Sequence, residues 1–382
     1  MKKFISAILL IAMVLSTVAC GNTQKEATSS SATATQVTSP KGEVRSYLTG
    51  EWVAKETNSK RPLAVMLSNQ PEAPNQSGIS DASIVYEAPA EQNYGTRFMG
   101  IFEDWEDIKK MGSVRSCRTY YVYFMMEFDS IYVHAGQAKF ALPYLEKEFV
   151  DDINSVYGSD ADAFYWVPEE GRAQEHTLFI SGENALTKSK EKKYRLEHES
   201  SYTGHYVFNE DDDKMISLSD GETAEIAIPG YYISEPWFEF DAEKGVYNRY
   251  QYRRELNEDS FHPVKQFDQA SGDILEYSNI IFQYCDISPY LDYEWNNEPT
   301  KYLNIDCLSG GKGKFITNGK AIDITWSKDS EWGVTHYYDN NGKEITLNQG
   351  KTWVCIIDTK ELDRVEISSI KNASISSKTM DN

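Results

Sequence analysis

The feature that most limits what this chain can fold into is a long series of short apolar runs separated by turn residues. After about residue 200 these runs alternate with turn dipeptides, of which Asn318-Gly319 and Asn341-Gly342 are the clearest. Asn-Gly is typical of the two-residue turn that joins antiparallel strands. Many short strands at such a spacing build a barrel or a sandwich. The sequence therefore predicts a β-rich domain over residues 201–365.

The first half of the chain mixes strand-like and helix-like patterns. Four apolar runs bounded by Gly, Pro and polar residues predict strands at 63–67, 83–88, 97–103 and 130–136. Helices are expected at 115–128, which is apolar on almost every side, at 138–148 and at 182–193. The predicted fold is an α+β or α/β N-terminal domain over residues 46–200, followed by the smaller β-rich domain.

The N-terminus has the layout of a secretory signal. Lys2 and Lys3 precede an apolar stretch that is too short for a comfortable membrane span, and small residues lead up to Cys20. This layout predicts a lipoprotein signal peptide at 1–20, with Cys20 lipidated as by palmitate; an ordinary secretory signal cut near Ala19 is the alternative. The protein would then be held at the extracytoplasmic face of the cell membrane.

Two low-complexity segments flank the predicted domains. Residues 21–45 are rich in Ser, Thr and Ala and carry almost no large apolar side chains, so burial cannot offset their ordering entropy. We expect this segment to be a flexible tether, and residues 366–382 to be a tail.

Charge and cysteine content exclude several classes of protein. The chain has 59 acidic and 38 basic residues and a formal charge of −21, without a basic stripe, which argues against nucleic acid and anionic lipid headgroups as partners. Besides Cys20 there are four cysteines without C-x-x-C spacing: Cys117, Cys285, Cys307 and Cys355. Buried free thiols are the first interpretation, and a bond from Cys285 to Cys307 or Cys355 is the alternative.

Two arginines precede the apolar segment of the helix expected at 115–128. Arg115 and Arg118 would stand where the helix dipole is already positive and where acidic residues are preferred. Free backbone N–H groups and two guanidinium groups could hold a phosphate or a carboxylate there. The alternative is structural, in that the two arginines pair with buried carboxylates, for which the candidates are Asp81, Glu87 and Glu103.

Histidines supply the remaining candidates for chemistry. His134 ends a predicted strand after Tyr132 and could act as an acid/base or as a donor to an anion. Arg172 and His176 are four residues apart, so both would face one side on a helical turn, and on an irregular loop they could still converge. His262 could hydrogen-bond to Asp268, although β-rich domains often contain such pairs.

Signatures of cofactors, metals and common hydrolases are absent from the sequence. The acidic runs at 210–213 and 339–342 do not match the twelve-residue calcium loop. There is no G-x-S-x-G, phosphate-binding loop, dinucleotide fingerprint or H-E-x-x-H motif. We therefore expect no cofactor and no metal.

Several blocks of the sequence resemble the YerB family of lipoproteins. They are RPLAVMLSNQPEAPNQSGISDASIVYEAPAEQNYGTRFMGIFED, GSVRSCRTYYVYFMMEFDSIYVHAG, RAQEHTLFISGENAL, GKFITNGKAIDITWSK and GKEITLNQGKTWVCIID, in family order between about residues 45 and 360. The resemblance implies two domains of unknown function and an envelope location. The motif positions it carries are Asn69, Ser77-Gly78, Asp81, Glu87, Thr96-Arg97, Arg115, Ser116, Arg118, His134 and Gly136, with His262 and Asp268 in the second domain. The chain departs from the family pattern at Cys117, Gln137 and Gln174-Glu175-His176.

These observations support three hypotheses about function. The first is a membrane-anchored lipoprotein that binds an anionic or hydroxyl-rich ligand of the cell wall or envelope through Arg97, Arg115, Ser116, Arg118, Tyr132 and His134. The second is an envelope hydrolase or transferase, with His134 or His176 as acid/base and Glu87 as an orienting carboxylate. The third is a scaffold for another envelope protein, which would use aromatic surface around Trp237, Trp295 and Trp332.

Overall fold

The computed structural model describes most of the chain from residue 39 to residue 375. The gaps in this range are 93–94, 157, 255–259, 291–293, 296–297 and 300. The predicted signal peptide, Cys20, and most of the predicted tether lie outside the described residues, as do residues 376–382 of the predicted tail and the side chain of Trp295.

The first half of the chain contributes five strands to a large mixed sheet. They are β3 (Leu63–Ser68), β4 (Ile84–Pro89), β5 (Thr96–Phe102), β7 (Ile131–His134) and β8 (Asp152–Asn154). β5 lies antiparallel between β4 and β3, and β7 and β8 continue the sheet in parallel. The four strands predicted in this half are therefore confirmed.

The second half extends the same sheet. Its members are β11 (Glu222–Thr223), β17 (Asn279–Pro289), β20 (Leu303–Asp306), β21 (Gly311–Thr317), β22 (Lys320–Lys328), β23 (Thr335–Tyr338) and β24 (Thr352–Asp358). β24 pairs in parallel with β17 on one side and with β4 on the other. The described residues thus form one 12-stranded sheet that contains strands of both halves, while the expected division at residue 200 stays a prediction.

A second, six-stranded antiparallel sheet packs against the first within the described residues. It consists of β12 (Ile226–Ile228), β13 (Trp237–Asp241), β14 (Val246–Arg253), β15 (His262–Lys265), β16 (Glu276–Tyr277) and β25 (Glu366–Ser368). Phe238 and Tyr247 of this sheet share an apolar cluster with Phe282 and Trp353 of the large sheet. The C-terminal half is therefore β-rich and largely antiparallel, as predicted, with a sandwich-like stacking of two sheets.

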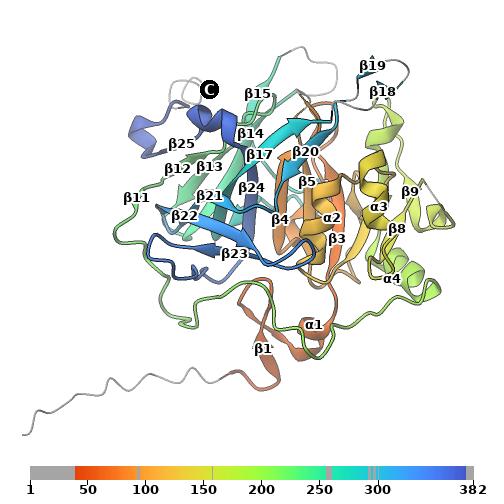
Figure 1. The fold of residues 1–382 in the computed structure, drawn as a ribbon, viewed down its shortest axis with the longest axis horizontal. Helices are drawn as coiled ribbons and strands as arrows, with labels where there is room; N and C mark the ends of the chain where they lie inside the picture. Colours follow the sequence, from red (N-terminus) through yellow and green to blue (C-terminus); the bar gives the residue numbers. More distant parts are fainter. Residues whose placement is uncertain are drawn as a thin grey trace, which may run out of the picture. The chain divides into compact units, whose positions relative to one another are not determined.

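Helices cover the large sheet on both faces. They are α2 (Thr119–Met126), α3 (Leu142–Leu145) and α4 (Gly182–Glu191), whereas α1 (Lys55–Ser59) lies against the two-stranded sheet of residues 43–54. Alternate residues of β3 point to opposite faces, so Ala64 and Met66 belong to the apolar cluster that contains α2, whereas Val65 belongs to the cluster that contains Ala185 of α4. Figure 1 shows α2 lying against the sheet beside β3 and β4.

Local sequence explains two of these elements. α2 is buried on nearly every side, because seven of its eight residues are buried, as its apolar composition predicts. α4 begins where Ser181 accepts a hydrogen bond of 3.2 Å from the backbone N–H of Asn184, which is the usual role of serine before a helix.

Short strands complete the described structure. They are β1 (Glu43–Arg45), β2 (Trp52–Ala54), β6 (Met111–Gly112), β9 (Phe164–Trp166), β10 (Leu178–Ile180), β18 (Glu294–Trp295) and β19 (Glu298–Pro299). β21 and β22 meet at Asn318-Gly319, where both residues have positive φ (48° and 72°), as the Asn-Gly turn requires. In the described part of the chain, Cys117, Cys285, Cys307 and Cys355 are buried and unbridged. No helix among the described residues is long and apolar enough to cross a membrane.

Candidate functional site

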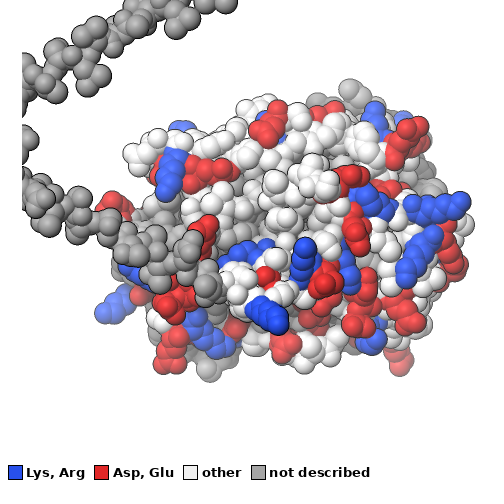
Figure 2. All heavy atoms as spheres, turned by 90° about the horizontal axis from the view of Figure 1, so that it is seen from below, with Lys and Arg blue, Asp and Glu red and all other residues white. Residues whose placement is uncertain are grey.

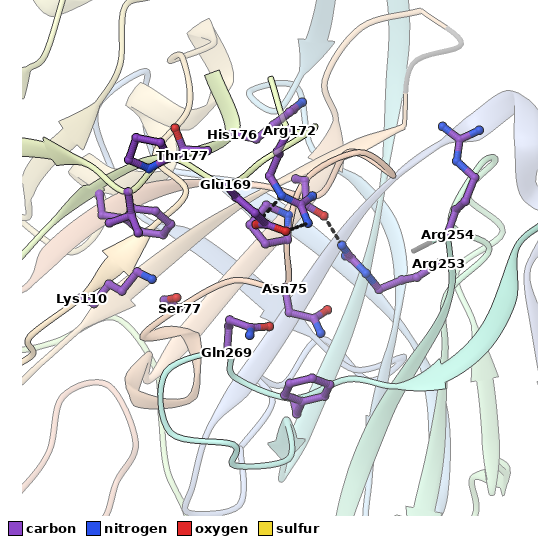
Figure 3. A pocket seen from close by; sticks show the side chains of 16 residues that line it. Asn75, Ser77, Lys110, Glu169, Arg172, His176, Thr177, Arg253, Arg254 and Gln269 are labelled. Carbon is purple, nitrogen blue, oxygen red and sulfur yellow. Dashed lines mark hydrogen bonds and ion pairs between the residues drawn. The ribbon is translucent and has the colours of Figure 1, made fainter. Parts of the chain in front are cut away.

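A pocket of about 520 Å³ opens between segments of the two halves of the chain. The first half contributes residues 73–77, Lys110 and residues 167–179, and the second half contributes residues 253–254 and 267–269. The lining residues are Ala73, Pro74, Asn75, Ser77, Lys110, Val167, Pro168, Glu169, Arg172, His176, Thr177, Phe179, Arg253, Arg254, Phe267 and Gln269 (Figure 3). Pockets of this size hold small molecules, whose sites range from about 300 to 1,000 Å³.

The ends of regular elements position the polar residues of this pocket. Arg253 is the last residue of β14, and Arg254 follows it. Lys110 directly precedes β6, and His176 closes the 3₁₀ turn η4 (Gln174–His176) before β10. The two halves touch at the pocket, since the backbone N–H of Gln269 donates 2.8 Å to the carbonyl oxygen of Gln76.

The charge of the pocket is opposite to that of the chain. Four permanent cations line it, namely Lys110, Arg172, Arg253 and Arg254, against one carboxylate, Glu169. The chain as a whole carries a formal charge of −21. On the face drawn in Figure 2, basic and acidic side chains are interspersed. The concentration of positive charge is thus a local property of this pocket, which suits it to an anion.

Protein groups hold the arginines of the pocket in place. Arg172 has a side chain only 9% exposed, and it donates to both carboxylate oxygens of Glu169, at 2.7 and 2.9 Å, and to the carbonyl oxygen of Glu72. Arg254 forms an ion pair of 3.0 Å with the carboxylate of Glu72, and Arg253 donates to the carbonyl oxygen of Ala73 (Figure 3). Because their partners fix these guanidinium groups, the positive wall is formed before a ligand arrives.

Three buried polar atoms in the pocket wall have no hydrogen-bond partner within the described structure. They are Nδ1 of His176, Oδ1 of Asn75 and Oγ of Ser77. Burial and the nearby Arg115 guanidinium lower the pKa of His176, so its imidazole is neutral at pH 7. These three atoms have almost no accessible surface, so they lie behind the pocket wall and are not presented to a ligand within it.

The structure brings together the three arginines predicted to bind a ligand, but inside the protein. Burial and repulsion from Arg118 and Arg115 lower the pKa of Arg97 to about 9. Arg97 donates 2.7 Å to the carbonyl oxygen of Ser116. None of the three is among the residues that line the pocket described above.

The partners of these arginines differ from the carboxylates expected from the sequence. Arg115 pairs with Glu175 at 3.4 Å and donates 3.0 Å to the side-chain oxygen of Gln70. Arg118, the residue that precedes α2, pairs with Glu91. The expected partners were Asp81, Glu87 and Glu103. Local spacing could not identify the true ones, because Glu91 and Glu175 reach the arginines only through the fold.

His134 and Tyr132 lie in the core of the large sheet. The Nδ1 atom of His134 is 2.8 Å from the carbonyl oxygen of Gly136, and its Nε2 atom is 3.1 Å from a carboxylate oxygen of Asp152. The ring of Tyr132 packs 4.9 Å from the His134 ring, and both side chains are buried. Neither residue lines the pocket between the halves, so their predicted ligand-binding role stays a prediction.

Glu87 is engaged by a buried network. Arg249 donates to both of its carboxylate oxygens, at 3.0 and 2.8 Å, and both side chains have no exposed surface. Thr96 donates 2.7 Å and the indole N–H of Trp353 donates 3.1 Å to the same carboxylate. These contacts hold Glu87 within the protein core, and its predicted role as an orienting carboxylate stays a prediction.

The other candidates are spread over the molecule. Asp268 is buried and accepts from the backbone N–H of Ser80 and Ala270, at 3.0 and 2.7 Å, while His262 is exposed and lies 3.2 Å from the Ser260 hydroxyl. Trp237 is fully buried, and Trp332 is half-buried against Phe149. No group of metal-ligating side chains occurs among the residues that the structure describes.

Part of the pocket was predictable from the sequence. Arg172 and His176, which the spacing paired, both line the pocket (Figure 3). Lys110, Arg253 and Arg254 were not predicted. A signal was present for the last two, because Arg253-Arg254 is the one Arg-Arg doublet in the sequence and it stands in the predicted β-rich half of an acidic chain.

Comparisons with known proteins agree on one family. Residues 48–195 match the family described as "Protein of unknown function (DUF3048) N-terminal domain", and residues 226–354 match its C-terminal domain. The chain is 29% identical over 327 residues to the protein named "Putative lipoprotein YerB" of Bacillus subtilis (strain 168). The alignment covers 85% of this chain and 89% of that protein. It also matches the crystal structure of YerB from Bacillus subtilis, with a TM-score of 0.69 and 26% identity over 85% of this chain and 100% of that chain.

Proposed function

The chain belongs to the DUF3048 family, whose N-terminal and C-terminal domains are both of unknown function, and we propose that in this protein they bind an anionic ligand between them. The observation that carries this proposal is the reversal of charge. Four cations and one carboxylate line the pocket of a chain whose formal charge is −21. Glu169 pairs with Arg172 and Glu72 pairs with Arg254, and an anion in the pocket would add its own attraction to the cations to that of these two carboxylates.

The position of the pocket supports the proposal. Its walls come from residues 73–179 and from residues 253–269, which fall in the regions that match the two family domains. Ligand sites occur preferentially at such junctions, because two surfaces can enclose a ligand there.

We further propose that the protein is anchored by lipid at the extracytoplasmic face of the cell membrane. Cys20 after Ala19 has the layout of a lipidation site, and the Bacillus subtilis relative is named "Putative lipoprotein YerB". A Cys20→Ala variant should appear in the soluble fraction of lysed cells or in the medium, whereas the unchanged protein should sediment with membranes. If both sediment alike, the lipid anchor is refuted.

Binding of inorganic phosphate tests the pocket directly. A ligand that binds only the folded protein raises the melting temperature in proportion to the logarithm of its concentration above its Kd. We expect phosphate to raise the melting temperature of the full-length protein in non-ionic detergent. Arg254→Gln and Lys110→Gln should each weaken phosphate binding several-fold. Arg254 suits this test because its side chain is 33% exposed, so its loss should not unfold the protein.

A matched control separates the pocket from general charge effects. Lys244 forms an exposed ion pair with Glu276 and does not line the pocket, so Lys244→Gln removes one positive charge elsewhere. Phosphate binding that falls equally in Lys244→Gln and Arg254→Gln would reflect net charge and would contradict the proposal.

In this proposal Arg115, one of the three arginines predicted to bind a ligand, supports the pocket wall and does not contact the ligand. Arg115 contacts the backbone of Glu175 at 3.0 Å, next to His176 in the pocket wall. Direct ligand contact by Arg97, Arg118 and His134 stays a prediction, and it would require a second opening near α2.

His176 favours a second candidate, an envelope phosphoester hydrolase. It lines the pocket beside the cations, and its lowered pKa leaves the ring neutral at pH 7. A neutral imidazole can accept a proton from an attacking water, and the cations could stabilise the negative charge that develops. Hydrolysis of p-nitrophenyl phosphate that disappears in His176→Gln would support this candidate, and absence of turnover would leave binding alone.

A further inference from the structure

We infer that His336, held between Asp329 and Glu344, is a pH-sensitive clasp that fixes the turn of residues 329–334 when its ring is charged. This turn joins β22 to β23 and carries Trp332. The clasp does not depend on the proposed function, because none of its three residues lines the pocket.

Both ring nitrogens of His336 face carboxylates. Nδ1 lies 2.5 Å from a carboxylate oxygen of Glu344, and Nε2 lies 3.2 Å from one of Asp329. A neutral imidazole has only one N–H and would turn a lone pair toward one of these two acceptors, whereas the charged ring donates to both. The charged form therefore fits this geometry. Burial opposes the charge, but the hydrogen bonds to Glu344 and Asp329 outweigh burial and raise the pKa of His336 above its ordinary value.

Other titratable groups also surround His336. On β23 itself, the ring of Tyr338 lies 6.2 Å from the His336 ring. β22 contributes Lys328, which forms a buried ion pair with Glu127, the residue that follows α2. His205 lies 3.2 Å from the same carboxylate, and burial lowers its pKa, so its ring is already neutral where His336 titrates. His336 is thus the histidine of this cluster that loses its charge at a pH above about 6.5.

Loss of the charge would release Asp329 before Glu344. The contact with Asp329 is the longer of the two, and the Asp329 side chain is 61% exposed, against 35% for Glu344. The proton that remains on the neutral ring would therefore stay on Nδ1, which faces Glu344. Because Asp329 is the first residue after β22, its release frees one end of the turn.

The other polar contacts of the turn are long. Two backbone hydrogen bonds within residues 329–334 measure 3.2 Å, and the hydroxyl of Tyr123 in α2 donates 3.3 Å to the Glu331 carboxylate. Hydrogen bonds of this length are at or beyond the upper end of the usual range and are weak. The contact between His336 and Asp329 should therefore decide how firmly the turn is held.

Trp332 links the turn to an aromatic cluster. Its ring centre lies 5.7 Å from that of Tyr123, 6.0 Å from that of Tyr144 in α3 and 5.0 Å from that of Phe149. Phe149 is already 51% exposed. A released turn would uncover more of these rings, and aromatic side chains are enriched in protein interfaces. The clasp would thus make an aromatic surface available in response to a rise in pH.

Hydrogen exchange measured by mass spectrometry tests the clasp in the full-length protein in non-ionic detergent. The stabilisation should be complete below about pH 6.5 and be lost as the pH rises through the raised pKa of His336. After correction for the intrinsic pH dependence of exchange, the protection of residues 329–338 should therefore fall several-fold between about pH 6 and about pH 9. The turn at Asn318-Gly319, which contains no histidine, is the internal reference and should keep its protection.

Substitutions at His336 separate its charge from its shape. His336→Arg keeps a positive charge and several donors at every pH of the test, so residues 329–338 should stay protected at the alkaline end. His336→Gln is neutral and should lose the protection already at the acidic end. Asp329→Asn changes an exposed side chain and should also remove the pH dependence, which keeps the test decisive if a variant at His336 does not fold.

Two results would overturn the inference. One is the same pH profile of protection in the unchanged protein and in His336→Gln or Asp329→Asn. The other is a fall in protection with rising pH that is as large in His336→Arg as in the unchanged protein, because it would assign the effect to a different titrating group.

Discussion

The buried ion pair between Glu87 and Arg249 is predicted to be essential for stability, and Arg249→Met tests this. Both side chains are completely buried, and Arg249 supplies two of the four hydrogen bonds to the Glu87 carboxylate, at 2.8 and 3.0 Å. Methionine keeps apolar bulk beside Phe98 and Trp353, whose rings lie 5.0 and 4.5 Å from the guanidinium carbon. The substitution therefore removes the positive charge and its hydrogen bonds and leaves most of the side-chain volume in place.

The expected loss follows from the charge left behind. Removing one partner of a buried pair leaves an uncompensated charge, which typically costs about 3–5 kcal/mol. For a unit of this size each kcal/mol shifts the melting temperature by about 2 °C, so we expect a fall of about 6–10 °C at pH 7. Urea unfolding followed by circular dichroism would measure the free energy of unfolding independently.

A double variant shows whether charge is the cause. Glu87→Gln combined with Arg249→Met removes the stranded carboxylate and keeps groups that can bond to Thr96 and Trp353, so it should be more stable than Arg249→Met alone. The exposed pair of Lys244 and Glu276 provides the control, and Lys244→Met should not change the melting temperature measurably. The reasoning is refuted if Arg249→Met costs less than about 1 kcal/mol or if the double variant is the less stable of the two.

Three further predictions concern other parts of the fold. Although burial opposes ionisation, hydrogen bonds from His198 and Arg195 lower the pKa of Asp129 to about 2, so its stabilisation should be complete above about pH 4 and be lost as the pH falls toward 2. The difference in melting temperature between the protein and Asp129→Asn should therefore shrink over that range, and a constant difference would contradict this. Gly182→Ala should destabilise the protein by about 1–3 kcal/mol or more in urea unfolding, because the new Cβ would lie 1.8 Å from the carbonyl oxygen of Trp105; an unchanged midpoint would show that α4 can shift. Burial raises the pKa of Cys117 and of Cys307 to about 12, so Ellman's reagent should label neither thiol until the protein unfolds, and rapid labelling of the native protein would show that these sites open.

Elements defined by local sequence were predictable. The four strands of the first half appear within one residue or two of the predicted ranges, and α4 begins after Ser181 as expected. The helix expected at 115–128 is shorter, because Arg118 is extended (φ −126°, ψ 154°) and the helix begins at Thr119. Hydrogen bonds explain this: the backbone N–H of Arg115 donates to Met66 and that of Cys117 to Gly136, which holds the segment in an extended form.

Long-range pairing could not be predicted from local pattern. Cys355 of β24 stands opposite Glu87 of β4, and Phe282 of β17 stands on the other side of Cys355. An apolar run such as TWVCIID indicates a buried strand, but it does not say which strand lies beside it. The pocket depends on such pairings, since Arg172 and Arg253 are brought to one cavity from different halves of the chain.

The buried network and the pocket are connected through β14. Arg249, which pairs with Glu87, and Arg253, which lines the pocket, lie four residues apart on this strand. Between them, Gln251 donates 3.1 Å to the side-chain oxygen of Asn69, just beyond the end of β3. Polar contacts of Arg249 and Gln251 thus fix β14 against the large sheet next to Arg253, which lines the pocket. If the pocket binds an anion as proposed, rigid support of this kind would reduce the cost of ordering its wall. That would be a reason to keep a buried ion pair where an apolar pair of the same shape could supply equal stability.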